Sequence, residues 1–136
     1  MKIILDTNVI ISSFAARGLC QSVFELCLDR FDIAISSSLI EEIRSVLKNK
    51  LKLPEILIKE ILDYLTENAA LYKTKALPSG VCRDPKDDHI IALAESAGAD
   101  YIITGDEDLI IMKKHGSTRI VTPRQFWQLS KKFPSF

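Results

Sequence analysis

The sequence alternates short apolar segments with longer segments in which apolar residues recur every three or four positions. The short segments have the length of buried strands, and the longer ones have the period of helices that pack one face against a sheet. The expected strands are residues 2–5, 31–35, 71–77, 101–104 and 120–121. Because successive parallel strands need a crossover between them, this alternation favours a parallel sheet with right-handed connections. We therefore predict an α/β fold of three layers, α/β/α, around a central parallel sheet of about five strands.

Helices are expected between these strands, and the residues at several helix ends support the assignment. Ser36, Ser37 and Ser38 are candidate N-caps of a helix that continues to Lys48, and Glu41 follows Ser38 at the spacing of a capping box. Residues 9–14 follow the first strand and precede an expected break at Arg17 and Gly18. The other expected helices cover residues 19–29, 54–70 and 84–97, a short segment that ends near residue 114, and the segment after residue 123.

The size and composition of the chain are those of an ordinary globular protein. Its 136 residues, 47% hydrophobic and 26% charged, include no linker, repeat or low-complexity segment, so we expect a single domain over residues 1–136. Charges interrupt every apolar segment within about ten positions and no signal peptide is visible, so we expect a cytoplasmic protein that binds no membrane. Cys20 and Cys27 would lie about 10 Å apart on one helix, beyond disulfide reach. No His or Cys spacing indicates zinc.

The first expected strand ends at Asp6, which is followed by Thr7 and Asn8. Open α/β sheets bind their ligands at the carboxyl ends of the strands, so Asp6 is a candidate functional residue. Taken alone, Asp6, Thr7 and Asn8 are better explained as a turn and a helix N-cap. The functional interpretation gains weight because three other carboxylates follow at comparable places.

Glu42 is the second candidate, and its position on its helix separates it from its neighbour Glu41. At roughly 100° per residue, Glu42 lies at the edge of the apolar stripe of this helix, whereas Glu41 points nearly opposite. The residues of the stripe are Leu39, Ile40, Ile43, Val46 and Leu47. We therefore expect Glu41 to be a capping or surface residue and Glu42 to be a carboxylate at the boundary of the core.

Several acids open the expected helix at residues 84–97. Asp84 as N-cap, Pro85 at the first helical position and Asp87 in the first turn are the residues that a helix start favours. Cap chemistry thus accounts for Asp84 and Asp87. Asp88 is left over as a candidate functional residue, although helical periodicity does not choose it over Asp87.

Asp106 repeats the placement of Asp6, because it follows the expected strand at residues 101–104. Asp6, Glu42, Asp88 and Asp106 can therefore converge at one edge of the sheet. Converging carboxylates repel one another and raise their own pKa values, so such a group implies a bound cation. Oxygen ligands without Cys or His favour Mg²⁺ or Mn²⁺. A divalent cation lowers the pKa of an attacking water and offsets charge on a phosphodiester, so phosphodiester hydrolysis is the expected reaction.

Four segments of the chain resemble the PIN-domain nucleases, and more closely the VapC-like toxin components of prokaryotic toxin–antitoxin pairs. These segments are Leu-Asp-Thr-Asn-Val at 5–9, the stretch 36–42, Asp-Pro-Lys-Asp-Asp at 84–88 and Ile-Ile-Thr-Gly-Asp-Glu-Asp-Leu at 102–109. Each motif is weak singly, but all four in this order and spacing are hard to obtain by chance, and the resemblance covers almost the whole chain. The resemblance implies a PIN-like fold whose first and fourth strands are adjacent. It also implies a metal-dependent endoribonuclease that hydrolyses RNA phosphodiester bonds.

The resemblance assigns roles to individual residues as well. It implies a catalytic site with Mg²⁺ or Mn²⁺ held by four acids: Asp6, Glu42, Asp88 and Asp106. The choice of Asp88 over Asp87 rests mainly on this resemblance. Asn8 and Thr104 are expected to hydrogen-bond the acidic cluster or its water. Asp108 is a candidate outer acid, and a surface role explains it at least as well.

The expected partners are RNA, an antitoxin protein and a second copy of the chain. A toxin implies a small antitoxin, a segment of which would place a basic side chain or a helix over the acidic cleft. Related domains often dimerise, and the apolar helix around residues 56–65 is a candidate dimer face, although core packing explains the same residues. These expectations come from the resemblance.

The charge balance is unusual for a protein that binds phosphates, because the chain has 18 basic and 18 acidic residues. Setting aside the four site acids leaves 14 acids, and so a net charge of +4 for the remaining surface. Candidate contacts to the RNA backbone are Lys48, Lys50, Lys52, Lys113, Lys114, Arg119 and Arg124. Solvated surface residues are the commoner explanation for each of them.

Three other functions fit less well. An aspartyl-phosphate phosphotransferase also uses an Asp after its first strand, but haloacid-dehalogenase-like families need a second Asp where this chain has Asn8. A dinucleotide-binding module needs a Gly-rich turn after the first strand, which is missing. The main alternative is a catalytically inactive PIN-like module that binds RNA or protein, and acids at all four positions disfavour it.

Overall fold

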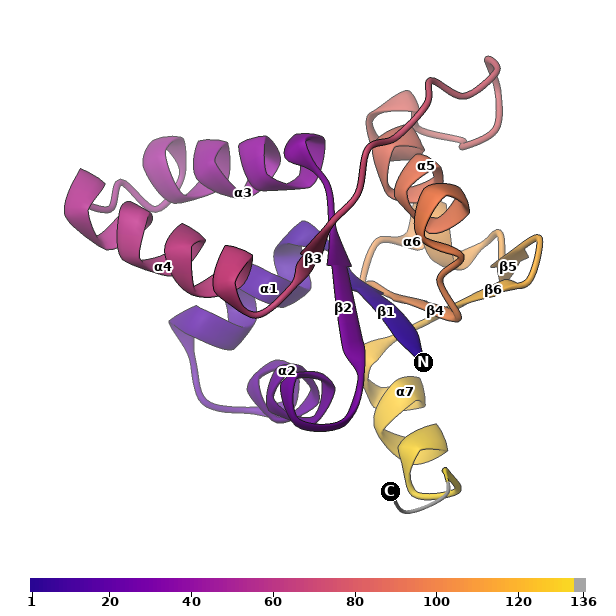
Figure 1. Ribbon diagram of the computed structural model, residues 1–136, viewed down its shortest axis with the longest axis horizontal. Helices are drawn as coiled ribbons and strands as arrows, with labels where there is room; N and C mark the ends of the chain where they lie inside the picture. The colour runs from indigo at the N-terminus through magenta and orange to yellow at the C-terminus, as the bar shows by residue number, and fades with distance from the viewer. Residues whose placement is uncertain (134–136) are drawn as a thin grey trace.

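The structure, a computed structural model, describes residues 1–133 and contains a six-stranded sheet in the order β3-β2-β1-β4-β6-β5 (Figure 1). All neighbouring strands are parallel except β5, which pairs antiparallel with β6 at the edge. The strands are β1 (Lys2–Leu5), β2 (Asp32–Ile35), β3 (Ala70–Leu71), β4 (Tyr101–Ile103), β5 (Lys114–His115) and β6 (Thr118–Val121).

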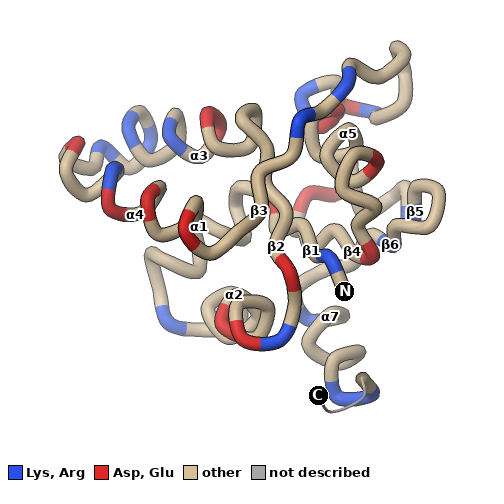
Figure 2. Tube along the Cα trace, in the orientation of Figure 1, with Lys and Arg blue, Asp and Glu red and all other residues tan. Residues whose placement is uncertain are grey.

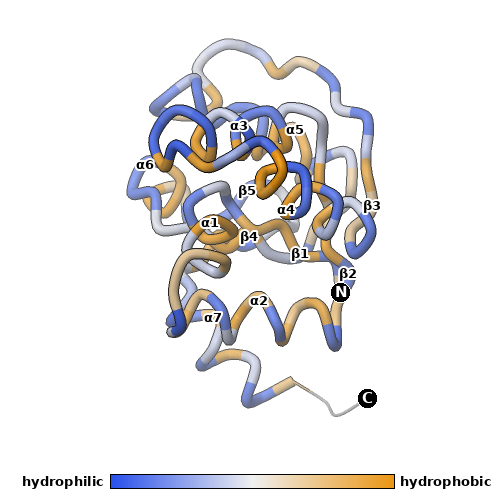
Figure 3. The backbone as a smooth tube through the Cα atoms, turned by 90° about the vertical axis from the view of Figure 1, so that its left-hand side faces the viewer, coloured by the Kyte–Doolittle hydropathy of each residue, from blue (hydrophilic) through white to orange (hydrophobic). Residues whose placement is uncertain are grey.

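Strands β1 and β4 lie side by side at the centre of the sheet, with Ile3 opposite Tyr101 and Leu5 opposite Ile103. This pairing confirms the expected adjacency of the first and fourth strands. Ile3, Leu5 and Ile103 are fully buried, as parallel strands covered on both faces must be, and Figure 3 shows the hydrophobic residues of β1 and β4 between the outer layers. From β1 the chain continues to β2 and β3 on one side, whereas β4 and β6 lie on the other. The carboxyl ends of β1 and β4 therefore flank the switch point of the sheet.

Helices cover both faces of the sheet, which confirms the predicted three-layer α/β/α architecture. In Figure 1, α1 to α4 lie on one side of the strands and α5 and α6 on the other, while α7 contacts α2. The α-helices of the described residues are α1 (Thr7–Ala15), α2 (Leu19–Arg30), α3 (Ser37–Asn49), α4 (Glu55–Glu67), α5 (Asp88–Ala97), α6 (Glu107–Ile110) and α7 (Pro123–Ser130), and a 3₁₀ turn, η1 (Pro85–Asp87), precedes α5.

The N-cap of α3 is Ser36, whose hydroxyl accepts the N–H of Leu39 at 3.2 Å. Ser38 and Glu41 both lie inside the helix, so the predicted capping box between them is wrong. The physical reason is that the helix begins two residues earlier than that pairing required, so its third residue is the apolar Leu39. Glu41 is an exposed residue without a capping role.

The predicted edge strand at residues 71–77 is wrong beyond its first residue. β3 contains only Ala70 and Leu71, and Tyr72 donates one further hydrogen bond, of 2.9 Å, to the carbonyl of Ile35 before the chain leaves the sheet. The alternating lysines there belong to an exposed connection. β5 was not predicted, because a two-residue strand carries no periodic signal.

No single helix of the described residues has both the length and the apolar character of a membrane span; α1 and α2 meet that test only as a pair, bent by 105°. Cys20, Cys27 and Cys82 are free thiols. The single domain over residues 1–136 stays a prediction, and its last three residues lie outside the part of the chain that the structure describes.

Candidate active site

Asp6 lies at the carboxyl end of β1 and is also the N-cap of α1. Its Oδ1 accepts the N–H of Thr7 at 2.8 Å, and its Oδ2 accepts the hydroxyl of Thr104 at 2.7 Å. Its own N–H donates to the carbonyl of Ile103 at 2.9 Å, which extends the pairing of β1 and β4. Only 5% of Asp6 is exposed. Asp6 therefore has the capping role that its sequence context allowed, and it is also fixed between the two central strands.

Thr104 links the acid that follows β1 to the acid that follows β4. Its buried hydroxyl donates to Asp6 and accepts the N–H of Asp106 at 3.0 Å. Asp106 is the N-cap of α6, and its Oδ1 accepts the N–H of Asp108 at 2.9 Å. Backbone donors at two helix starts thus hold Asp6 and Asp106 at the same edge of the sheet.

Glu42 reaches this edge from α3. It is half-buried whereas Glu41 is exposed, which agrees with the predicted phase of the helix. Oε2 of Glu42 lies 2.5 Å from Nε2 of His89 on α5, so the imidazole donates a hydrogen bond to the carboxylate. The charge of Glu42 contributes to raising the pKa of Asp6, so Glu42 is part of the same acidic cluster.

Asp87 and Asp88, which helical periodicity left undecided, have different surroundings. Asp87 forms a hydrogen bond with Asp106, and the charges of Asp106 and Asp6 both raise its pKa. Asp88, the first residue of α5, is hydrogen-bonded to the buried thiol of Cys82. One buried oxygen of Asp87 and one of Asp88 have no hydrogen-bond partner among the described residues. Asp87 therefore faces Asp6 and Asp106, and Asp88 lies beside it against Cys82.

Burial and mutual repulsion raise the pKa values of two of these acids. For Asp6, burial is the largest cause and the charges of Glu42 and Asp106 add to it, while hydrogen bonds to its oxygens oppose the shift. For Asp87, burial comes first and the hydrogen bond and charge of Asp106 follow, and together they raise the pKa to about 7. Because the two carboxyl groups interact, Asp87 and Asp106 share a proton to a higher pH than an isolated Asp would keep one when no cation is bound.

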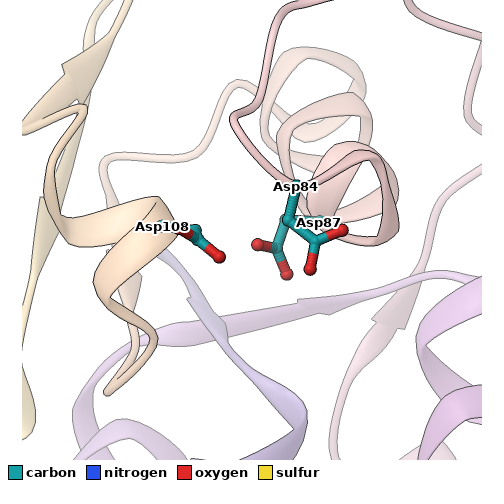
Figure 4. A group of neighbouring side chains, drawn as sticks. All are labelled: Asp84, Asp87 and Asp108. Atoms are coloured by element: carbon teal, nitrogen blue, oxygen red, sulfur yellow. The ribbon is translucent and has the colours of Figure 1, made fainter.

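A second acidic group, Asp84, Asp87 and Asp108, adjoins the first. Their carboxylate oxygens lie within 4.8 Å of one another, and Figure 4 shows Asp84 and Asp87 facing Asp108 across the space between η1 and α6. Two of the three have other roles. Asp84 caps η1 by accepting the N–H of Lys86 at 3.0 Å, and Asp108 accepts a hydrogen bond of 2.5 Å from Nε of Arg83. Asp87 is the member whose carboxyl group also interacts with the carboxyl groups of Asp6 and Asp106, whereas Asp108 contacts Asp106 through its backbone N–H.

The carboxylate oxygens at this edge are the kind of ligand that a hard divalent cation prefers, and among the described residues those of Asp84, Asp87 and Asp108 are the group that lies within 4.8 Å of one another. A cation bound by carboxylate oxygens would take the place of the shared proton and relieve the repulsion that raises the pKa values. One oxygen of Asp87 and one of Asp88 accept no hydrogen bond from the described residues, so both are free to bind a cation. The nearby soft groups, His89 and Cys82, are hydrogen-bonded to carboxylates. The candidate ligands are Asp6, Glu42, Asp87, Asp88 and Asp106.

Asn8, expected to hydrogen-bond the acids or their water, is exposed and makes no side-chain hydrogen bond to the described residues. Conversely, the sequence did not identify His89 or Cys82 as part of the site. His89 contacts Glu42 across 47 positions of sequence, and a contact of that kind leaves no periodic signal. Asp87 was visible only as the alternative to Asp88.

Comparison of the sequence with known protein families identifies the family to which the chain belongs. The PIN domain matches residues 2–108, which include the four predicted site acids. The chain belongs to the PIN-domain family. This membership makes it a relative of nucleases, the hydrolases that act on nucleic acids. No protein of curated function matches the chain.

Two solved structures show the same PIN fold. One is VapBC2 from Rickettsia felis bound to a DNA fragment from its promoter, with 20% identity, a TM-score of 0.64 and coverage of 90% of this chain and 98% of that one. The other is DNA-bound VapBC from Salmonella typhimurium, with 22% identity, a TM-score of 0.62 and the same coverage of 90% and 98%. At these identities the likeness is one of fold.

Proposed function

We propose that this PIN-domain protein is an Mg²⁺- or Mn²⁺-dependent endoribonuclease and the toxin of a toxin–antitoxin pair. The observation that carries the proposal is the link from Asp6 through the Thr104 hydroxyl to Asp106 at the ends of β1 and β4. Capping alone does not require these two acids to meet, because each already has a backbone donor in its own helix. Their convergence with Glu42 and Asp87 supports a site for a cation and a phosphate.

Each acid has a distinct part in this proposal. Asp6 and Asp106 are rigid ligands, since backbone and hydroxyl donors fix their carboxylates. Glu42 is held by His89 through Oε2, which leaves Oε1 to orient a water or a substrate hydroxyl. Asp87 and Asp88 lie at the start of α5, and each has one oxygen that accepts no hydrogen bond from the described residues. A bound divalent cation supplies a water of lowered pKa and positive charge beside the scissile phosphate.

Cleavage of RNA is the direct test of this proposal. Purified protein is incubated with a 5′-labelled single-stranded RNA and with DNA of the same sequence, each with Mg²⁺, with Mn²⁺ and with excess chelator. We expect internal cleavage of the RNA with either metal and no cleavage with chelator. Cleavage that persists in chelator, or in both Asp6→Asn and Asp88→Asn, contradicts the mechanism.

The inactive binding module is the alternative that this experiment separates. It predicts that labelled RNA or a protein partner binds without being cut under every metal condition. The intact acids at all predicted positions favour the nuclease. The cytoplasm, where RNA substrates are synthesised and translated in a prokaryote, is the compartment that the proposed activity requires.

An apolar groove between α1, α3 and α4 supports a protein partner. The groove has a volume of about 430 Å³, and Phe14, Leu51 and Leu57 line it while remaining 37%, 44% and 38% exposed. Exposed apolar surface of this kind marks protein contacts. We propose that an antitoxin segment with apolar side chains covers it, as the two related structures are of VapBC complexes. The mass of the purified protein, measured alone and with the antitoxin, distinguishes this from a homodimer formed through residues 56–65.

A further inference from the structure

A cavity of about 390 Å³ lies between strand β6 and helix α7. We propose that this cavity, called the α7 cavity here, binds a phosphate of the RNA strand at a distance from the bond that is cut. Its polar lining consists of Lys113, Arg119, Gln125, Gln128 and Lys132. The proposal rests on the nuclease function proposed above and adds to it a second contact with the same substrate.

The polar atoms that line the α7 cavity are mostly hydrogen-bond donors. Lys113, Arg119 and Lys132 are cationic, and no acidic residue is among the lining residues. Oε1 of Gln125 already accepts the N–H of Thr122 at 2.9 Å, in the capping box of α7. The free end of Gln125 is therefore its amide NH₂, which can only donate. A phosphate group accepts hydrogen bonds through its oxygens, so it is bound by a site in which donors outnumber acceptors.

The three cations of the cavity have no competing acid. None of them forms an ion pair with residues 1–133. The ion pairs in this part of the chain involve different cations, such as Arg44, Arg83 and Lys59. A bound anion would supply the counter-charge that these exposed cations lack among the described residues. Figure 2 shows basic residues at both ends of α7 and none of the acidic colour on that helix.

The backbone fixes two of the three cations beside β6. Arg119 is a residue of that strand, and its guanidinium lies 5.9 Å from the centre of the Tyr101 ring, which limits its motion. Lys113 has a φ of 62°, in the left-handed region that residues other than glycine seldom adopt. Its carbonyl accepts the N–H of Ile120 at 2.9 Å, so the hairpin holds it in this conformation. A backbone conformation of this kind indicates a constraint on where the Lys113 side chain can reach.

The α7 cavity is connected to the acidic site through one strand. Val121 lines the cavity, and its carbonyl accepts the N–H of Thr104 at 2.9 Å, while the hydroxyl of Thr104 contacts Asp6. Arg119, however, pairs with Tyr101 at the amino end of β4, so the cavity extends along β6 away from the acids. A nucleic acid strand that reaches both would follow β6 from its carboxyl end. The lining residues all lie beyond residue 108, outside the segment that the PIN domain matches. The cavity is thus a feature of this chain that the family match does not include.

The test compares two triple variants that remove the same charge. The first, Lys113→Gln with Arg119→Gln and Lys132→Gln, removes the three exposed cations that line the cavity. The matched control, Arg17→Gln with Lys73→Gln and Lys131→Gln, changes three exposed cations that do not line it and are not candidate contacts to the RNA backbone. Binding of a labelled single-stranded RNA is measured in chelator from 0.05 to 0.3 M salt, and circular dichroism melting checks that both variants fold.

Three phosphate contacts should contribute about 2 to the slope of log affinity against log salt, since a single strand contributes roughly 0.7 per contact. We expect the cavity variant to lose this slope and to bind roughly 100-fold more weakly at 0.1 M salt, and the control to change by less than about threefold. Equal losses in both variants would mean diffuse charge attraction and would overturn the proposal. Competition by inorganic phosphate and by a mononucleotide at millimolar concentration shows whether a free anion suffices or a strand is needed; a free anion that binds as tightly as the strand also overturns it.

A measurement on the wild type keeps the proposal testable if the cavity variant does not fold. The side-chain amide resonances of Gln125 and Gln128 are followed by NMR as RNA is added in chelator, and saturation without a shift in either contradicts the proposal. Different results would disprove the proposed nuclease function and the proposed phosphate site. RNA that binds with these shifts but is never cut rules out the nuclease alone, whereas RNA that is cut at an unchanged KM by the cavity variant rules out the cavity alone.

Discussion

The hydroxyl of Thr104 donates to Oδ2 of Asp6 at 2.7 Å, and the two residues are 98 positions apart in the sequence. Because Thr104 is fully buried and also accepts the N–H of Asp106, this one hydroxyl sets the distance between the acids at the ends of β1 and β4. The arrangement depends on the adjacency of the two strands.

Replacing Thr104 with Val keeps the shape of the side chain and removes the hydroxyl. Oδ2 of Asp6 and the N–H of Asp106 then lose a partner in a buried place, which should cost about 1–3 kcal/mol of unfolding free energy. Cleavage should fall as well, because the acids lose their fixed separation. Denaturant unfolding and RNA cleavage are measured for Thr104→Val beside Thr104→Ser, which keeps the hydroxyl. If both substitutions behave alike, the hydroxyl does not position the acids.

Glu42→Gln should lower cleavage by on the order of 100-fold, the loss typical of removing a group that acts on the transition state. Glu41→Gln on the same helix is the matched control and should leave the rate within about twofold. The difference follows from their surroundings, since Glu42 is half-buried against His89 whereas Glu41 is exposed. Single-turnover cleavage rates measure both. Comparable losses would show that Glu42 is not part of the site.

The raised pKa of Asp87 predicts how the metal-free protein responds to pH. An acid with a raised folded-state pKa stabilises the fold below its unfolded value, near 4, and this stabilisation is lost as the pH rises through about 7. Unfolding in chelator should therefore become easier between about pH 4 and pH 7. Asp87→Asn should reduce that dependence, whereas Asp88→Asn, beside Cys82, should change it less. Urea midpoints at several pH values provide the measurement, and an unchanged slope in Asp87→Asn would contradict the assignment.

The toxin proposal predicts that controlled expression of the wild-type chain in a bacterial host arrests growth. Asp6→Asn should relieve the arrest, because the variant keeps the fold but loses a ligand of the proposed site. Growth curves after induction, with immunoblots to match protein levels, make the comparison. Equal growth of the two strains would remove the toxin role and leave the nuclease activity to be judged by cleavage in vitro.

The central strands and the placement of Asp6 and Asp106 could be predicted from sequence, because buried parallel strands are apolar and end abruptly at polar residues. The phase of α3 was also predictable, since its apolar stripe separates Glu42 from Glu41. Other features depend on contacts distant in sequence or too short to be periodic. The bond from His89 to Glu42 and the β5–β6 hairpin are of this kind. The different surroundings of Asp87 and Asp88 arise from the 3₁₀ turn before α5, which periodicity does not reveal.

The melting temperature of the wild type and of Asp6→Asn, each in chelator and in millimolar Mg²⁺ or Mn²⁺, tests the central claim most directly. Burial and the charges of Glu42 and Asp106 raise the pKa of Asp6, so removing its charge should stabilise the metal-free protein at neutral pH. Metal should raise the melting temperature of the wild type by mass action, and should raise that of Asp6→Asn less. If Asp6 is only the cap of α1, the substitution will be neutral or destabilising in chelator, and the two proteins will respond equally to metal. A wild type whose melting temperature does not change with either cation would contradict the account.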